Sequence, residues 1–569
     1  MGLISTSLRR RLQVAAITFL SLAVTGLAPA WAQEQLQPQP AAAPAAGANQ
    51  PFLVVTLGSL NKLTQDLDYV AAVAGQADMA MTAKMFTGMY ASAVDMNQPI
   101  GVIVSLVQGA PEPVILLPTA DVKTLLKMVE GQVGPSEELN DGTMVINAMG
   151  NNVYIRQSGN WAYLARNRDL FSTVPADPAG LFDGLGNNYN LAVRLRVQDV
   201  PVGLRDMLIG QIRQGFEQSM QQQGGDEGRE IAENSLRQFE QLLDETDELM
   251  FGINVDSARK QLAIDTMATA VPGSKMAAMY AGQQAIPSQF ASVIRPDAAM
   301  YYHGATSIGP ETIDQTRDSL QGSIGMIKNA LEQQADLSAT DQEMVSKLVD
   351  RVADLTMNSV AEGKTDAGAV LLTGNGKLEF ALGGFVADGN EAASIVKDLA
   401  KEVEGKPDAP RFMFDQQTYG GVTMHVVEAD VPAEADEARK VFGDTLRVHI
   451  GTAPKAVYVA LGDDSVPLLK SLIDGGKSDT GAAGRPLGQM RMTMMPILQY
   501  ARSIESNEMM DQLIDALARS SDQGLVTFTT EKIENGADSK IRIGDGILQA
   551  IGVAAKAAND ARMNNANQF

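Results

Sequence analysis

Apolar positions along the chain change from a spacing of two residues to spacings of three and four and back again, which predicts alternating strands and helices. Residues Asn152–Phe171 (NVYIRQSGNWAYLARNRDLF) predict two strands joined at Ser158-Gly159-Asn160 and running into a helix start. A weaker copy stands far downstream at Arg447–Lys470 (RVHIGTAPKAVYVALGDDSVPLLK). Its Val457–Ala460 aligns with Ala162–Ala165, so the sequence indicates an internal repeat.

The order of the predicted elements also occurs twice. Residues 51–285 predict a buried strand, two helices, a hairpin, a further helix, the two strands above, another strand, two long helices and two closing strands. Residues 297–560 predict the same succession, with an acidic surface helix inserted at 429–444. We therefore predict an α+β protein of two similar tandem domains, each a curved, mostly antiparallel sheet covered by long amphipathic helices.

Two local features make this prediction specific. Thr119 is expected to cap the helix that follows it. Tyr189–Val197 (YNLAVRLRV) is expected to be a strand, and its alternation places Arg194 and Arg196 on the face opposite its leucine and valine side chains.

Long helices are predicted between the strands of both copies. Val200–Gln223 and Glu227–Asp244 have amphipathic spacing and are separated by a Gly-Gly pair. In the second copy, Pro496–Arg519 is expected to match the first of these helices, with a shorter return.

The first 32 residues have the pattern of a secretory signal peptide. Arg9-Arg10-Arg11 form a charged start, Val14–Leu27 is apolar, and Ala30-Trp31-Ala32 fits a cleavage site. An uncleaved anchor is the alternative, and both general and twin-arginine export are compatible with the arginine run.

The segments next to the predicted cleavage site and at the chain end are compositionally biased. Residues 33–50 are rich in Pro, Ala and Gln and predict a disordered leader, and 561–569 predict a disordered tail. No later segment is apolar enough to span a bilayer, so we expect an exported protein in the periplasm or outside the cell.

Composition excludes several classes of function. The chain of 569 residues has 45 Lys and Arg against 68 Asp and Glu, a formal net charge of −23, and such a surface repels nucleic-acid phosphates. Because there is no cysteine, disulfides, thiolate nucleophiles and cysteine-ligated metals are excluded. Aromatic residues are few and Met numbers 28, so Met must fill part of the core.

The chain has three histidines, His303, His425 and His449. His425 and His449 lie in predicted strands that are expected to be neighbours, and two histidines on one sheet face could hold a metal. A third ligand is not evident, so we favour ordinary half-buried histidines and assign no metal ligand. Whether the two side chains converge depends on the tertiary structure.

Other motif-like segments are incomplete. Ser394-Ile395-Val396-Lys397 has the Ser-x-x-Lys form of penicillin-binding serine enzymes but lacks their companion motifs. Gly475–Ser478 ends like a phosphate loop without the following helix, and the carboxylates of Asp244–Glu248 lack the alternation of a calcium loop. We assign no catalytic or cofactor-binding residue and no cofactor.

Three segments of the chain are similar to a group of large secreted proteins of planctomycete-type bacteria. They are Asn160–Leu185 (NWAYLARNRDLFSTVPADPAGLFDGL), Tyr189–Pro201 (YNLAVRLRVQDVP) and Ala270–Lys275 (AVPGSK). The resemblance covers nearly all of the chain after the predicted signal peptide. It implies export and the same duplicated build, but the group has no assigned activity, so no catalytic residue is implied.

These observations favour an exported, non-enzymatic cell-envelope protein that binds an apolar ligand or another envelope component. The Met-rich strand Met490–Met495 is a candidate lining for a soft apolar groove. The alternative is a structural module that self-associates through sheet edges or through the interface between the copies. A hydrolase ranks third, because it needs a cleft with converging polar groups.

Overall fold

The computed structural model describes residues 51–566, with gaps at 76, 108–109, 149, 173, 176, 183, 224–238, 333–338, 375, 406–408, 463–464, 477–478 and 480. The predicted signal peptide, the predicted leader and the last three residues lie outside the described residues. Most of the second long helix, predicted at Glu227–Asp244, lies outside them as well.

The strands are β1 Leu53–Leu57, β2 Ile100–Val107, β3 Ala110–Pro118, β4 Glu137–Glu138, β5 Met144–Ala148, β6 Asn151–Ser158, β7 Trp161–Ala165, β8 Leu191–Arg196, β9 Thr246–Asp256, β10 Gln261–Ala270, β11 Gln284–Ala285, β12 Met300–Ser307, β13 Lys364–Gly374, β14 Lys377–Phe385, β15 Arg411–Tyr419, β16 Val422–Asp430, β17 Thr445–Ala453, β18 Ala456–Gly462, β19 Gly488–Thr493, β20 Leu525–Ile533 and β21 Gly536–Gly544.

The helices are α2 Leu60–Val73, α3 Ala77–Tyr90, α4 Val122–Val133, α5 Val202–Gln223, α7 Lys275–Gly282, α8 Pro310–Glu332, α9 Ala339–Ala361, α10 Gly389–Val403, α11 Asp436–Phe442, α12 Ser465–Gly475, α13 Met494–Ile504, α14 Glu508–Arg519 and α15 Asp545–Ala566, with short 3-10 helices η2 Arg168–Ser172, η3 Ala179–Phe182 and η4 Ala291–Val293.

All described strands belong to one antiparallel sheet, which confirms the predicted α+β class. Across the sheet the order is β4-β5-β6-β7-β3-β2-β1-β8-β9-β10-β21-β20-β19-β12-β13-β14-β18-β17-β16-β15, with the short β11 beside β12. We expected one sheet in each half of the chain; the sheet instead runs through both halves without interruption, joined where β10 pairs with β21.

The order in which the strands are connected is the same on both sides of this junction. Asp265 and Lys540 face each other in the middle of the β10–β21 pair. Outward from it, the strand connections of the first half match those of the second, and the registers match as well. Leu53 lies between Val104 and Leu195, and its counterpart Met300 lies between Leu371 and Met492. In the same register Ala165 corresponds to Ala460, and Arg194 to Arg491.

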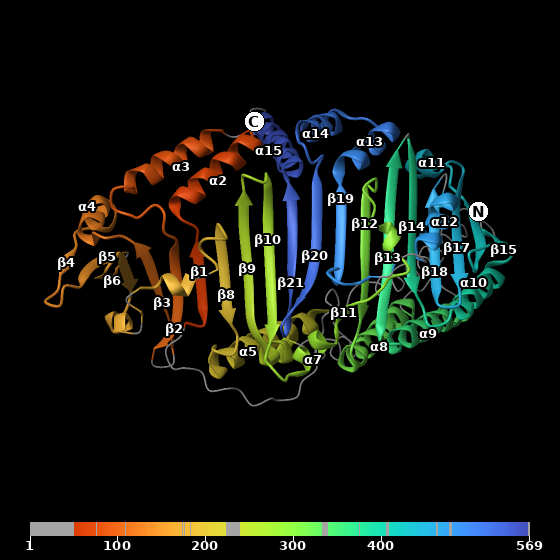
Figure 1. Ribbon diagram of the computed structural model, residues 1–569, viewed down its shortest axis with the longest axis horizontal. Coiled ribbons are helices and arrows are strands. Elements are labelled where there is room, and N and C mark those ends of the chain that lie inside the picture. The colour runs from red at the N-terminus through yellow and green to blue at the C-terminus, as the bar shows by residue number, and fades with distance from the viewer. Residues whose placement is uncertain are drawn as a thin grey trace.

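Helices lie along both ends of the strands. Figure 1 shows α2, α3, α13, α14 and α15 along one end, and α5, α7, α8 and α9 along the other. Ser59 caps α2 by accepting a hydrogen bond from the Lys62 amide. The cap of α4 is Asp121, which accepts from the Thr124 amide, so the prediction of Thr119 was wrong. The Thr119 hydroxyl bonds the carbonyl of Ala93 instead.

Three other boundaries differ from the predictions. Pro496–Arg519 forms two helices, α13 and α14, because the chain leaves the helical conformation at Glu505 and Asn507 begins a new helix as its cap. Helix α15 continues to Ala566, into the stretch expected to be a disordered tail. The edge strand β15 was not predicted. The inserted acidic helix is present as α11, which has no buried residue.

Because side chains alternate along a strand, the sheet has two distinct faces. We call the face that carries Arg194, Arg491 and Arg542 the arginine face, and the opposite face, which carries Phe251, Phe528 and their cross-strand neighbours, the apolar face. The names hold across the whole sheet, because directly paired residues share a face.

Two cores lie on the arginine face, one in each half. In the first half η2 and η3 cover the sheet, with Phe182 against Trp161 at a ring-centroid distance of 5.8 Å. In the second half η4 and α12 do so, with Phe290 against Tyr458 at 5.5 Å. On the apolar face, α4 covers one flank of the sheet through Val122 and Leu126.

Candidate functional site

The two histidines of greatest interest do not converge. His425 pairs with Ile450, and the adjacent His449 pairs with Val426, so the two imidazoles lie on opposite faces of the sheet. His425 is buried on the apolar face, where its Nδ1 accepts a hydrogen bond from the Asp415 amide and its ring packs edge-on against Phe414. This arrangement gives His425 a structural role and provides no metal pair.

His303 is fully buried on the arginine face. Neither ring nitrogen has a hydrogen-bond partner among the described residues. Loss of hydration lowers the pKa of His303 to about 4, so the ring is neutral near pH 7. A neutral, enclosed imidazole with no bonded nucleophile cannot reach a substrate.

A buried polar cluster lies beside His303. The Ser288 hydroxyl donates to Asp366 at 2.6 Å, and the amides of Gln289 and Ser288 donate to Asp366 and Asp479, both at 2.7 Å. Arg485 holds Asp479 with two hydrogen bonds of 2.7 and 2.8 Å. Burial raises the pKa of Asp366 to about 6. Serine, histidine and aspartate meet here, but all three are buried and the serine bonds the aspartate instead of the histidine.

The Ser-x-x-Lys segment has no catalytic geometry. Ser394 accepts a hydrogen bond from Arg351 at 3.0 Å, while Lys397 reaches Asp415 at 3.3 Å and lies over the Phe414 ring. Serine and lysine therefore have separate partners, as expected for side chains on the surface of α10.

The glycines and carboxylates singled out above also have structural roles. Gly475 ends α12 and Gly476 follows it. A Cβ would collide with Ser292 at Gly475 and with the Gln289 carbonyl at Gly476; Lys477 and Ser478 lie outside the described residues. Within Asp244–Glu248, Glu245 accepts from the Met276 amide at 2.7 Å and so supports the start of α7.

The apolar face carries a long continuous row of apolar side chains. One cross-strand row runs through twelve successive strands from β9 to β15. Its members are Val255, Leu262, Ile543, Val526, Met492, Met300, Leu371, Phe380, Leu461, Val448, Val427 and Phe412. Every one is apolar, and every one is only half-buried. None of the twelve belongs to, or is packed against, a buried core cluster of the described residues.

Parallel rows extend the same surface into the first half. Phe251, Val193, Val55, Val102 and Ile115 face one another across β9, β8, β1, β2 and β3. Phe251 is 39% exposed and Ile115 is 43% exposed. The Met-rich strand identified in the sequence contributes to this surface, because Met490 and Met492 lie on it.

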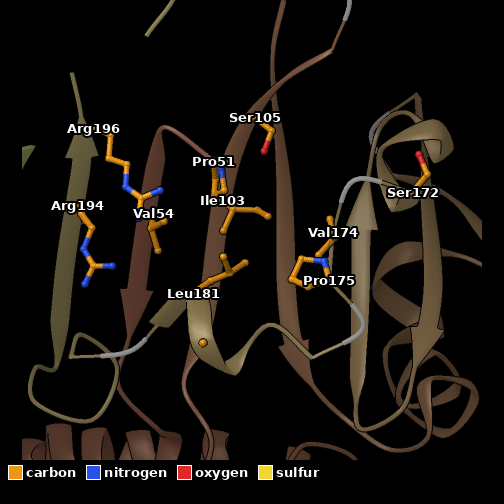
Figure 2. A pocket seen from close by; sticks show the side chains of 11 residues that line it. Pro51, Val54, Ile103, Ser105, Ser172, Val174, Pro175, Leu181, Arg194 and Arg196 are labelled. Carbon is orange, nitrogen blue, oxygen red and sulfur yellow. The ribbon is translucent and has the colours of Figure 1, made fainter. Parts of the chain in front are cut away.

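A cavity of about 500 Å³ opens on the arginine face of the first half. Figure 2 shows Arg194 and Arg196 extending from β8, with Val54, Ile103 and Leu181 forming an apolar wall beside them. The Nε atoms of Arg194 and Arg196 lie 3.7 and 3.8 Å from the Glu248 carboxylate. The alternation around Arg194 is visible in the sequence, but the cavity also depends on Val174, Pro175 and Leu181, which line it.

Among the described residues, no helix has both the length and the apolarity that crossing a bilayer requires. In the same part of the chain, no three or more His, Cys, Asp or Glu side chains are grouped so that they could hold a metal ion. Comparison of the whole chain with protein-family models, curated proteins and solved structures found no match.

Proposed function

We propose that the protein is an exported, non-enzymatic binding protein of the cell envelope whose apolar face carries lipid acyl chains. The observation that carries this proposal is the continuous row of twelve half-buried apolar side chains from Val255 to Phe412, none of which belongs to a core cluster of the described residues. At the usual strand spacing the row extends about 50 Å, beyond the ~30 Å hydrocarbon thickness of a bilayer.

The chemistry of the apolar face supports acyl chains as its occupant. The backbone groups of interior strands are paired within the sheet, so the surface offers few hydrogen-bonding atoms. Where Thr530 and Ser539 lie on this face, their hydroxyl groups bond each other at 3.0 Å. A protein partner normally supplies a hydrogen bond every 100–200 Å² or so of interface, whereas acyl chains need none. Exposed apolar patches of more than a few hundred Å² mark interaction sites.

The matching connectivity and registers of the two halves support a further proposal about origin: the chain arose by duplication of a half-length ancestor. The equivalent positions of Ala162–Ala165 and Val457–Ala460 agree with the sequence alignment that suggested it. Duplication then explains why the apolar surface is continuous, since each half contributes the same rows. We also propose that the protein is exported and that it belongs to the secreted planctomycete-type group.

Self-association is the second candidate. Assembly through sheet edges is disfavoured, because β4 is a two-residue strand of exposed Glu137 and Glu138 and β15 is interrupted by a bulge with Asp415 at φ 55°. Face-to-face pairing of two copies would cover the apolar faces and is the form of self-association that the structure favours.

Native mass spectrometry of the protein purified from its own host tests the proposal. We expect monomers with extra masses that denaturation releases as acyl lipids. A ligand-free monomer would contradict acyl-chain binding, and a ligand-free dimer would favour face-to-face pairing instead.

A matched pair of variants locates the ligand. Phe528 lies on the apolar face, and the next residue, Thr529, lies on the arginine face. Phe528→Lys places a charge among the apolar rows and is expected to lower bound lipid several-fold, whereas Thr529→Lys is expected to retain it. Equal lipid content in both variants would place the ligand elsewhere.

A further inference from the structure

Helix α3 carries exposed methionines on one face. Met81, Met85 and Met89 stand four residues apart, so their side chains lie on the same face of the helix on successive turns. Their exposed fractions are 69%, 72% and 53%, and the first two are the most exposed large apolar side chains among the described residues. Packing into a core therefore does not explain why methionine stands at these three positions.

A fourth exposed thioether comes from α4. Met128 is 40% exposed, and its Sδ accepts a hydrogen bond from the Ser92 hydroxyl at 3.9 Å, just beyond the last residue of α3. Ser92 follows Met89 by three residues, so this contact brings the Met128 sulfur to the C-terminal end of α3. Figure 1 shows α4 next to one end of α3. We call Met81, Met85, Met89 and Met128 the methionine row.

The surroundings of the methionine row are suited to a cation. Lys84 stands between Met81 and Met85 in the sequence, but its Nζ lies 2.7 Å from a carboxylate oxygen of Asp68, which balances its charge. The chain as a whole has a formal net charge of −23, which favours the approach of cations. A thioether is only a weak hydrogen-bond acceptor, so the bond from Ser92 orients the Met128 sulfur without making it a costly ligand to recruit.

The ligand type selects the kind of ion. Thioether sulfur is a soft, uncharged donor that favours Cu(I), whereas calcium and magnesium require oxygen ligands. The chain has no cysteine, so thioethers are its softest side chains, and none of its three histidines is exposed. Leucine would supply the same apolar area to a protein partner. The use of methionine at all four positions therefore favours a ligand that recognises sulfur.

We propose that the methionine row binds one soft monovalent metal ion, Cu(I), through thioether sulfurs from both helices. Met85, Met89 and Met128 are the three ligands, and Met81 offers a further sulfur one turn along α3. Side chains four residues apart on a helix have Cβ atoms about 5–6 Å apart and can converge on one ion, as the two histidines of helical zinc sites do. This site is separate from the acyl-chain surface, and either proposal can fail without the other.

Isothermal titration of the full-length mature protein tests this inference, with Ag(I) in chloride-free buffer as a redox-stable soft ion of the same charge as Cu(I). We expect one saturable Ag(I) site and at least tenfold weaker binding of Zn²⁺. X-ray absorption of the protein loaded with Cu(I) is expected to show sulfur ligands. Equal affinity for Zn²⁺, or nitrogen and oxygen ligands alone around Cu(I), would overturn the proposed chemistry. Absence of a saturable Ag(I) site would overturn the proposal and leave the methionine row as an apolar contact surface.

Variants assign the site. Replacing Met81, Met85 and Met89 together by leucine keeps side-chain volume and helix propensity, and is expected to weaken Ag(I) binding at least tenfold. Met128→Leu alone is expected to weaken it at least threefold and serves if the triple variant does not fold. Met207→Leu is the matched control, because Met207 is 51% exposed on α5 and has no methionine three or four residues away. It should bind within twofold of the wild type. Unchanged binding in the triple variant or in Met128→Leu, or an equal loss in Met207→Leu, would overturn the assignment.

Discussion

At the scale of single residues, the clearest divergence between the halves is at one buried position. Thr56 and His303 occupy matching places in β1 and β12, both are fully buried, and their side-chain polar atoms have no partner among the described residues. Thr56 is uncharged at every pH, whereas His303 must either stay neutral or carry a buried charge. The nearby Asp366 is also buried, and it must either stay neutral or carry a buried negative charge.

Protonation of these two residues makes stability depend on pH in opposite directions. The pKa of His303 is about 4 in the folded protein, below its ordinary value, so its contribution is lost as pH falls from about 6.5 towards 4. The pKa of Asp366 is about 6, above its ordinary value, so its contribution is present at low pH and lost as pH rises through about 6. Asp479 and Arg485 also face His303, and their effects on its pKa oppose each other.

We predict that His303→Thr reduces the loss of unfolding free energy between pH 7 and about pH 4.5 by about 2–3 kcal/mol relative to the wild type. Asp366→Asn should enlarge that loss by about 2 kcal/mol, because the compensating carboxyl is removed. Urea unfolding at the two pH values measures both changes. Shifts of the same sign in the two variants would refute the assignment of opposing titrations.

At the scale of elements, different segments perform the same task in the two halves. Phe182 in η3 presses on Gly101, where a Cβ would lie 2.2 Å from its ring, and Phe290 next to η4 presses on Gly368 and Gly383 in the corresponding strands. The covering segments come from different places in the chain. In both halves an aromatic ring occupies the space that a side chain would fill if the strand glycine were another residue. The covering segment can therefore pack closely on the strand.

Truncation of one aromatic ring tests how much these covering segments contribute to the free energy of unfolding. Phe290→Ala is expected to lower the unfolding free energy by about 3–5 kcal/mol, because the ring is completely buried and leaves a cavity. Phe251→Ala, on the apolar face and 39% exposed, is the control and should cost about 1 kcal/mol or less. Denaturant unfolding of lipid-free protein measures both. Equal losses would mean that the apolar face is covered in solution.

At the scale of the whole molecule, the junction of β10 and β21 turns two half-sheets into one. Asp265 is central to it: Arg542 donates to one carboxylate oxygen, and the Tyr189 hydroxyl donates to the other at 3.0 Å. Its side chain is only 15% exposed. Burial and the adjacent Asp265 raise the pKa of Tyr189 to about 12, so the phenol remains a donor at neutral pH.

We predict that Asp265→Ala destabilises the protein by about 1–3 kcal/mol, because buried donors on both halves lose their acceptor. Glu531→Ala removes an exposed partner of Lys540 on the same face and should change stability by about 1 kcal/mol or less. Thermal unfolding compares the two. A smaller loss for Asp265→Ala than for Glu531→Ala would show that the junction does not depend on this network.

Much of the element order could be predicted from the sequence because it depends on local signals. The spacing in Ser59–Val73 and the turn at Ser158-Gly159-Asn160 act over a few residues, and both elements are present. Boundaries were less predictable. Thr119 and Asp121 are both accepted cap residues; in the structure Asp121 caps α4 and the Thr119 hydroxyl bonds the Ala93 carbonyl. Strand β15 alternates poorly and gave no usable signal.

The amino-acid sequence by itself determined the α+β class, the repeated order of elements and the placing of Arg194 opposite the apolar side chains of its strand, since each follows from local periodicity. The tertiary structure alone decided that both halves share one sheet, that His425 and His449 face apart, that a cavity opens on the arginine face, and that no core cluster of described residues includes the row from Val255 to Phe412. These outcomes depend on which distant strands pair and which segments cover them, and pairing between remote strands depends on contacts that local sequence does not specify.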